Sequence, residues 1–139
     1  MSWSSVATQI ATVMTANGYS ISSTPIIFEN ASSIVDSTYS LEYRTSRTSD
    51  TINNAYRTRH ISNVIIRIAK KLSAGDRMGS YNTFISSVED TIKDLETTSN
   101  WAVSTSTIVY IRFLNNSIRL DKVNYIALAD IEIEITHTV

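Results

Sequence analysis

Histidine and cysteine, the residues that most often carry nucleophilic or metal chemistry, are scarce in this chain. It has no cysteine, which removes thiolate nucleophiles, thiolate zinc sites and internal disulfides together. The two histidines, His60 and His137, show no metal-binding spacing and lie in no serine-elbow or triad-like context. Three glycines are too few for a phosphate-cradling loop. The sequence therefore predicts no catalytic site, no metal site and no cofactor.

Paired carboxylates are the remaining route to acid–base chemistry. Glu132 and Glu134 alternate with isoleucines near the C-terminus, and Glu89, Asp90 and Asp94 lie close together further upstream. The simplest interpretation of both groups is the solvated face of a strand and of a helix. A small enzyme that uses carboxylates alone stays as a minor alternative. It would require two carboxylates that converge in a pocket and have shifted pKa values.

The distribution of charge along the chain is more informative than its net value of −1. Basic residues dominate from Arg44 to Lys71, where the single acid is Asp50, whereas acids concentrate from Glu89 to Glu96 and from Asp130 to Glu134. One interpretation is local imbalance on a solvated surface. The other is a basic and an acidic face that complement each other head to tail between copies. The candidate contact residues are Arg44, Arg47, Arg57, Arg59, Glu132 and Glu134.

A third interpretation of the basic segment 44–71 is a small nucleic-acid-binding module. Lysine and arginine can neutralise phosphates without reading any base, and such binding weakens steeply with salt. Base stacking would require exposed aromatic residues among the basic ones, and Tyr56 is the one candidate.

Apolar residues at helical spacing predict two helices. Val6, Ile10, Val13 and Met14 form the first stripe, which ends before Asn17-Gly18. A second helix is expected after Ser73-Ala74-Gly75. Its stripe is Tyr81, Phe84, Ile85, Val88, Ile92 and Leu95, which leaves Ser86, Ser87, Glu89, Asp90, Lys93 and Asp94 for solvent.

Strand patterns occupy the rest of the chain. Pro25 precedes a short buried strand at 26–28, and a second strand alternates Tyr39, Leu41 and Tyr43 with polar residues. Residues 45–54 lack apolar periodicity and predict a long polar loop or hairpin tip, followed by a long strand over about 55–69. Because the first half of that strand is polar on both faces, we expect it to project beyond the core.

The last third again predicts strands. Val109, Ile111 and Phe113 alternate, Asn115-Asn116 suggests a turn before Ile118 and Leu120, and a final strand runs over 123–135. Together the patterns predict a single α+β domain over 1–139. Its sheet should be mostly antiparallel, with about 4–6 strands and both helices on one face. The longest apolar runs are three residues, such as Val64-Ile65-Ile66, so no membrane-spanning segment is expected.

This order of elements resembles the tail terminator (tail-completion, minor tail) proteins of long-tailed bacteriophages. The likeness covers nearly the whole chain, and its local motif is the proline-led strand with an acidic-Asn end, Pro25-Ile26-Ile27-Phe28-Glu29-Asn30. A Tyr-Leu-Tyr strand, a polar loop, a long strand, an amphipathic helix and a closing Ile131-Glu132-Ile133-Glu134-Ile135 strand follow. The chain departs from the family in its loops, where serine, threonine and asparagine replace glycine and proline.

The resemblance implies a structural virion protein that is not an enzyme and needs no cofactor. Such proteins form a homohexameric ring at the head-proximal end of the tail tube, stop tube polymerisation and join the tail to the head connector. The implied partners are copies of itself, the tail tube protein and a connector or neck protein, and DNA crosses the lumen without being read. Assembly would take place in the host cytoplasm. A neighbouring neck protein is the alternative within this class, and the polar segment 44–59 is expected to point towards the lumen or the tube.

Overall fold

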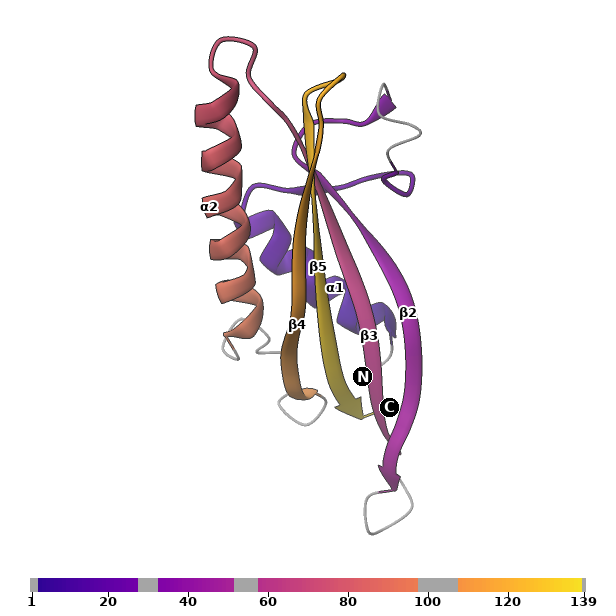
Figure 1. The fold of residues 1–139 in the computed structure, drawn as a ribbon. Helices are drawn as coiled ribbons and strands as arrows, with labels where there is room; N and C mark the ends of the chain where they lie inside the picture. The colour runs from indigo at the N-terminus through magenta and orange to yellow at the C-terminus, as the bar shows by residue number, and fades with distance from the viewer. Residues whose placement is uncertain (1–2, 28–32, 52–57, 98–107, 139) are drawn as a thin grey trace.

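The computed structural model describes residues 3–27, 33–51, 58–97 and 108–138, and the description below is confined to them (Figure 1). The elements follow the order α1 (Trp3–Ala16), β1 (Ser20–Ile21), β2 (Thr38–Thr51), β3 (Thr58–Lys71), α2 (Arg77–Glu96), β4 (Ile108–Asp121) and β5 (Ile126–Thr138). The strands form one five-stranded sheet in the order β1-β2-β3-β5-β4. Its pairs are antiparallel except β1 with β2. The predicted α+β class with a mostly antiparallel sheet is confirmed.

Both helices pack on the same face of the sheet, as the sequence predicted. Val6, Ile10 and Met14 of α1 are fully buried, and Val88 and Leu95 of α2 join them in one apolar cluster. The cluster continues onto alternate residues of the central strands, which are Val64, Ile66 and Ile68 of β3 and Ala129, Ile131, Ile133 and Ile135 of β5. Burial of this set is the main stabilising contribution to the fold.

A second, smaller cluster lies on the opposite face, at the end where β3 finishes and β5 begins. Ile26 and Ile34, from the segment between β1 and β2, cover Ala69, Ile126 and Leu128. The start of β5 is therefore buried on both faces, and its strict inside–outside alternation begins only after Leu128. Figure 1 shows this segment lying across one end of the sheet. The predicted buried strand at 26–28 is wrong for the residues described: 26–27 are outside any strand, and Ile26 is buried as part of this cover.

The predicted polar loop at 45–54 is wrong for residues 45–51, which belong to β2. Backbone pairing with β3 continues from Thr45 opposite Asn63 to Thr51 opposite Thr58, with register shifts at Tyr43/Thr45 and Thr48/Thr51. Residues 52–54 lie outside the described part of the chain. In Figure 1 the β2–β3 hairpin continues past the ends of β4 and β5. The expectation that polar strand ends project beyond the core is confirmed for these strands.

The C-terminal hairpin also differs from its prediction. Asn115 and Asn116 lie inside β4, opposite Glu132 and Ile131, and mark a register shift after Phe113 instead of a turn. The turn comes later, between Asp121 and Ile126. Val123 and Tyr125, expected at the start of the final strand, therefore belong to the turn and are exposed.

Helix α2 begins and packs for identifiable reasons. Asp76 caps its first turn by accepting a 2.9 Å hydrogen bond from the backbone N–H of Gly79. Along the helix, Phe84, Val88, Thr91 and Leu95 are buried. Ile85 and Ile92 are only half-buried beside that stripe, and Ser87, expected in solvent, is half-buried with its hydroxyl against Tyr19. The predicted helix is confirmed, but its buried face is turned slightly from the predicted one.

Candidate interaction surfaces

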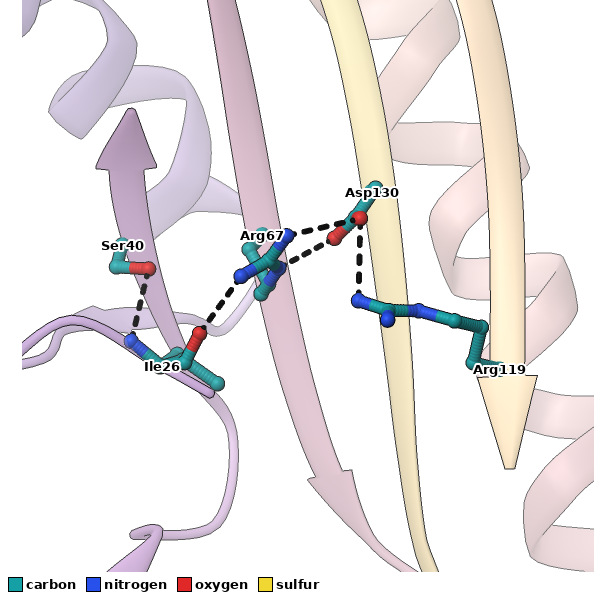
Figure 2. Close-up of polar contacts among 5 residues, drawn as sticks. All are labelled: Ile26, Ser40, Arg67, Arg119 and Asp130. Carbon is teal, nitrogen blue, oxygen red and sulfur yellow. Dashed lines mark hydrogen bonds and ion pairs between the residues drawn. The ribbon is translucent and has the colours of Figure 1, made fainter. Parts of the chain in front are cut away.

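A network of charged groups ties three strands and a loop together on the face away from the helices (Figure 2). Arg67 of β3 donates two hydrogen bonds to Asp130 of β5, Nε to Oδ1 at 2.6 Å and Nη2 to Oδ2 at 3.1 Å. Arg119 of β4 reaches the same Oδ2 from 3.3 Å. Arg67 also donates from Nη1 to the backbone carbonyl of Ile26 at 2.9 Å. The N–H of Ile26 donates to Ser40 Oγ at 3.3 Å, so the loop segment is held from both sides.

This network changes the interpretation of the charge pattern. Arg67 belongs to the basic segment and Asp130 to the acidic strand, yet β3 and β5 are neighbours and the two residues are directly opposed. At this position the expected separation into a basic face and an acidic face is wrong, because the charges neutralise each other within the molecule. The fork geometry of the pair and its partial burial, with 20% and 19% of the side chains exposed, make it a structural clamp.

The predicted contact arginines lie along the projecting hairpin. Arg44 is exposed at the register shift of β2. The backbone of Arg47 is opposite Ile61, and that of Arg59 is opposite Thr138 of β5. Arg57 lies outside the described residues. The structure thus places three of the four positions on the β2–β3 hairpin, at or beyond the edge of the helix-covered core.

Glu132 and Glu134 lie on the sheet face away from the helices. Glu132 is opposite Ile65 of β3 and Asn115 of β4, and Glu134 is opposite Asn63 and Arg112. Both side chains are half-buried. The interpretation as a polar strand face fits this placement.

Ser62 and His137 form a hydroxyl–imidazole contact that sequence reasoning missed. Ser62 Oγ lies 3.0 Å from His137 Nε2 and 3.3 Å from the hydroxyl of Tyr43. Ser62 is 1% exposed and His137 is 4% exposed, so a substrate carbonyl could not reach the hydroxyl. The contact satisfies buried polar groups at the end of the core and offers no nucleophile. The sequence contains no motif that predicts this contact, because strand register alone brings the two residues together.

The β4–β5 turn has an exposed apolar tip, and hydrogen bonds to Asp121 hold its backbone. Asp121 accepts hydrogen bonds from the N–H groups of Val123 and Asn124 at 2.9 and 3.1 Å and from Asn124 Nδ2 at 2.9 Å. These bonds, foremost that from the Asn124 side chain, lower the pKa of Asp121. Tyr125 adopts a positive φ of 52°, and the guanidinium carbon of Arg77 lies 3.4 Å from its ring centre. Val123 is held 85% exposed at the tip.

Other exposed apolar side chains lie at the same end of the molecule. Figure 1 shows that the β4–β5 turn, the start of α2 and the segment after β1 all reach this end, opposite the hairpin. The exposed apolar residues of these segments and of the adjoining ends of β1 and β4 are Ile21, Ile27, Val35, Met78, Leu120, Val123 and Tyr125. Grouped apolar exposure of this kind is characteristic of protein contact surfaces.

A pocket of about 580 Å³ lies between α2, the end of β3 and the segment that joins α1 to β1. Hydroxyl groups line much of it, including those of Ser37, Ser80 and Ser87, and Lys70 and Lys71 border it. Tyr19 OH is 2.5 Å from Ser87 Oγ, and burial of the ring raises the pKa of Tyr19 although this hydrogen bond lowers it.

The described residues contain no group of three or more histidine, cysteine, aspartate or glutamate side chains that could hold a metal ion. Within the same residues, neither helix combines the length and the apolar character that crossing a bilayer requires.

Comparison with known proteins finds a shared fold in one solved structure that is described below. No protein-family model matches the chain, and no curated protein sequence does. Among solved structures, the chain is similar to a chain of the "Virion of native gene transfer agent (GTA) particle". The match has a TM-score of 0.56 at 11% identity and covers 99% of this chain and 100% of the other. At that identity the likeness concerns the fold, over the full length of both chains.

Proposed function

We propose that this protein is a structural component of a phage-like virion that forms a ring at the head-proximal end of a tail tube. In this role it ends tube polymerisation and joins the tail to the head connector. The observation that carries the proposal is the full-length fold likeness to a chain of a gene transfer agent particle. The sequence resemblance to tail terminators leads to the same class from independent features.

The sheet supports this proposal because it is open at both edges. Among the described residues, β4 pairs only with β5, and β2 pairs with β1 through Ser20 and Ile21 alone. Open edges on opposite sides of a sheet are suited to contacts between successive copies. Copies related by such unlike surfaces close into a ring or continue as a filament.

The projecting hairpin supplies the surface proposed for the tube or the lumen. Its paired backbone extends beyond the core, and it bears Arg44, Arg47 and Arg59. We propose these arginines, together with Arg57, as contacts with an acidic tube end or with the backbone of passing DNA. Backbone contacts of this type position DNA without reading its sequence.

Two measurements on the purified protein test the proposal. Light scattering during gel filtration should give the mass of a closed ring, with a hexamer as the expected species. Addition of the ring to polymerising tail tube protein from the same genome should stop tube growth at the added end, as seen by electron microscopy. A protein that binds finished tails but never stops growth would be a neck protein, and one that does neither would contradict the proposal.

A DNA-binding assay over a range of salt concentrations tests the alternative that the protein is a nucleic-acid-binding module. Tight binding of free duplex DNA that weakens steeply with salt would favour that module. We expect weak binding, because Arg67 and Arg119 are already engaged by Asp130.

A further inference from the structure

Asn17 and Gly18, at the end of helix α1, form a pair that can lose the asparagine amide spontaneously. Of the ten asparagines in the chain, Asn17 alone is followed by glycine. Glycine has no side chain, so its backbone nitrogen can approach the side-chain carbonyl carbon of the preceding asparagine without steric hindrance. Asparagine is among the thermolabile residues of proteins. The sequence Asn17-Gly18 therefore marks the position where this chain is most prone to deamidation.

In the folded protein both reacting groups are held in hydrogen bonds. Gly18 has a positive φ of 87°, and its backbone N–H, the attacking group, donates to the carbonyl of Thr15 at 3.0 Å. The side-chain Nδ2 of Asn17 donates to the carbonyl of Val13 at 2.9 Å and to Oδ2 of Asp94 at 3.0 Å. Because ring closure consumes the Gly18 N–H and expels the amide nitrogen, the reaction must break all three bonds.

The bond between Asn17 and Asp94 also joins the end of α1 to the last turn of α2. Both side chains are half-buried. Asp94 lines a small cavity of about 150 Å³ together with Thr12, Val13 and Ala16 of α1. The packing of α1 against α2 therefore decides whether the Asn17 amide is held or free.

Deamidation would convert this link into a repulsion. The Gly18 nitrogen forms a bond to Cγ of Asn17, the amide nitrogen leaves as ammonia with the Gly18 proton, and water then opens the cyclic imide to a carboxylate. The net change replaces an amide by a carboxylate, with water consumed and ammonia released. The new charge would lie beside the Asp94 carboxylate and at the C-terminal end of α1, where the helix dipole also disfavours a negative charge. Because the donor Nδ2 is lost with the ammonia, the link cannot form again.

We infer that Asn17 is a deamidation site that the contact between α1 and α2 protects, and that loss of its amide permanently weakens this contact. A chain whose first helix stays packed keeps the amide, because the reaction must first break the bonds at Asn17 and Gly18. A chain in which the end of α1 opens is exposed to the reaction, and its product cannot repack as before. The modification thus records opening of the first helix, independently of any role in a virion.

Deamidation rates, measured by tandem mass spectrometry of proteolytic peptides, test the protection. In urea that unfolds the protein, Asn17 should lose its amide roughly tenfold or more faster than in the folded protein, because unfolding frees both reacting groups. In the folded protein Asp94→Ala should also accelerate the loss, since it removes one acceptor of Nδ2. Asp90→Ala, which removes an exposed carboxylate one turn earlier in α2, is the matched control and should leave the rate unchanged. Equal rates in folded and unfolded protein, or no acceleration in Asp94→Ala, would overturn the protection.

The stability of variants that mimic the product tests the consequence. Asn17→Asp should unfold at a lower urea concentration than Asn17→Ala, because both variants lose the donor and only the first adds a charge. Part of this loss should be recovered in Asn17→Asp/Asp94→Asn, where the repulsion is removed. Asn82→Asp, at an exposed position of α2, is the control for an added charge and should change stability little. An Asn17→Asp variant as stable as Asn17→Ala would overturn the proposed weakening, whether or not the virion role is correct.

Discussion

At the scale of single residues, Asp130 of β5 links its own strand to β3 and β4. Its two oxygens accept from Arg67 and Arg119, and Arg67 in turn holds the backbone of Ile26 (Figure 2). Removing the carboxylate takes two charge-assisted hydrogen bonds from Arg67 and loosens the loop that covers the second apolar cluster. The sequence offers no sign of this arrangement, because Arg67 and Asp130 are far apart in the chain and meet only through strand register.

Asp130→Ala should lower the free energy of unfolding by about 1–3 kcal/mol, the usual contribution of hydrogen bonds to a charged group. Urea denaturation followed by circular dichroism measures the change. Glu132→Ala, two residues along the same strand face, is the control and should cost little. Equal losses of unfolding free energy in both variants would show that the pairing of Asp130 with Arg67 does not stabilise the fold.

Tyr19 makes stability depend on pH in the alkaline range. Burial raises the pKa of its phenol above the usual 10.0, so the folded state holds the proton more tightly than the unfolded state. This contribution is fully present below pH 10.0 and is lost as pH rises through the raised pKa. Tyr19→Phe should therefore reduce the loss of stability that urea denaturation measures at alkaline pH. Near neutral pH the same substitution should lower the free energy of unfolding by about 1 kcal/mol, because it removes the hydrogen bond to Ser87. Burial also raises the pKa of Tyr39, so part of the loss should persist.

At the scale of elements, α2 shows how far the sequence determines packing. Its apolar spacing predicted the helix and the face that it buries, and Phe84, Val88 and Leu95 confirm that face. The buried face of α2 is turned slightly from the predicted apolar stripe. The positions of α1 and Tyr19 decide which residues beside the stripe are covered. Ser87 is an example: it is polar and was expected in solvent, but it serves as the partner of the Tyr19 hydroxyl.

Leu95→Ala should destabilise the protein by about 2–5 kcal/mol, since the side chain is fully buried and its removal leaves a cavity in the shared core. Ser86→Ala, on the exposed side of the same helix, should change stability by less than about 0.5 kcal/mol. Thermal unfolding of the two variants compares them. Similar values would mean that α2 does not pack on the sheet as described.

The strands were harder to predict where pairing overrides local pattern. Asn115 and Asn116 have the composition of a turn, but the long ladder with β5 keeps them inside β4 with a register shift. Residues 45–51 have no apolar face, and their strand structure comes from backbone bonds to β3. Ser20 and Ile21 form too short a strand to leave any periodic signal. The candidate interaction surfaces were least predictable, because they combine residues from separate elements.

At the scale of the whole molecule, the two ends differ in chemistry. One end presents exposed apolar residues on the β4–β5 turn, the start of α2 and the segment after β1, and the other end is the polar β2–β3 hairpin (Figure 1). A component that joins two different assemblies requires two different ends. We therefore assign the hairpin end to the tube or lumen and the apolar end to the next component, as part of the proposed function.

Replacing residues 47–61 by Asn-Gly tests the role of the hairpin. Ser46 and Ser62 are directly opposed, so a two-residue turn can join them without changing the register of the strands that remain. The buried residues Val64, Ile66 and Ile68 stay, and we expect a folded protein with a modest loss of stability. If the hairpin contacts the tube, the variant should still form rings but should no longer stop tube growth. Charge reversal at Arg57 and Arg59 should impair the same step, whereas Arg112→Glu should not. A shortened ring that caps tubes as well as wild type would contradict this assignment and move the tube contact to the apolar end.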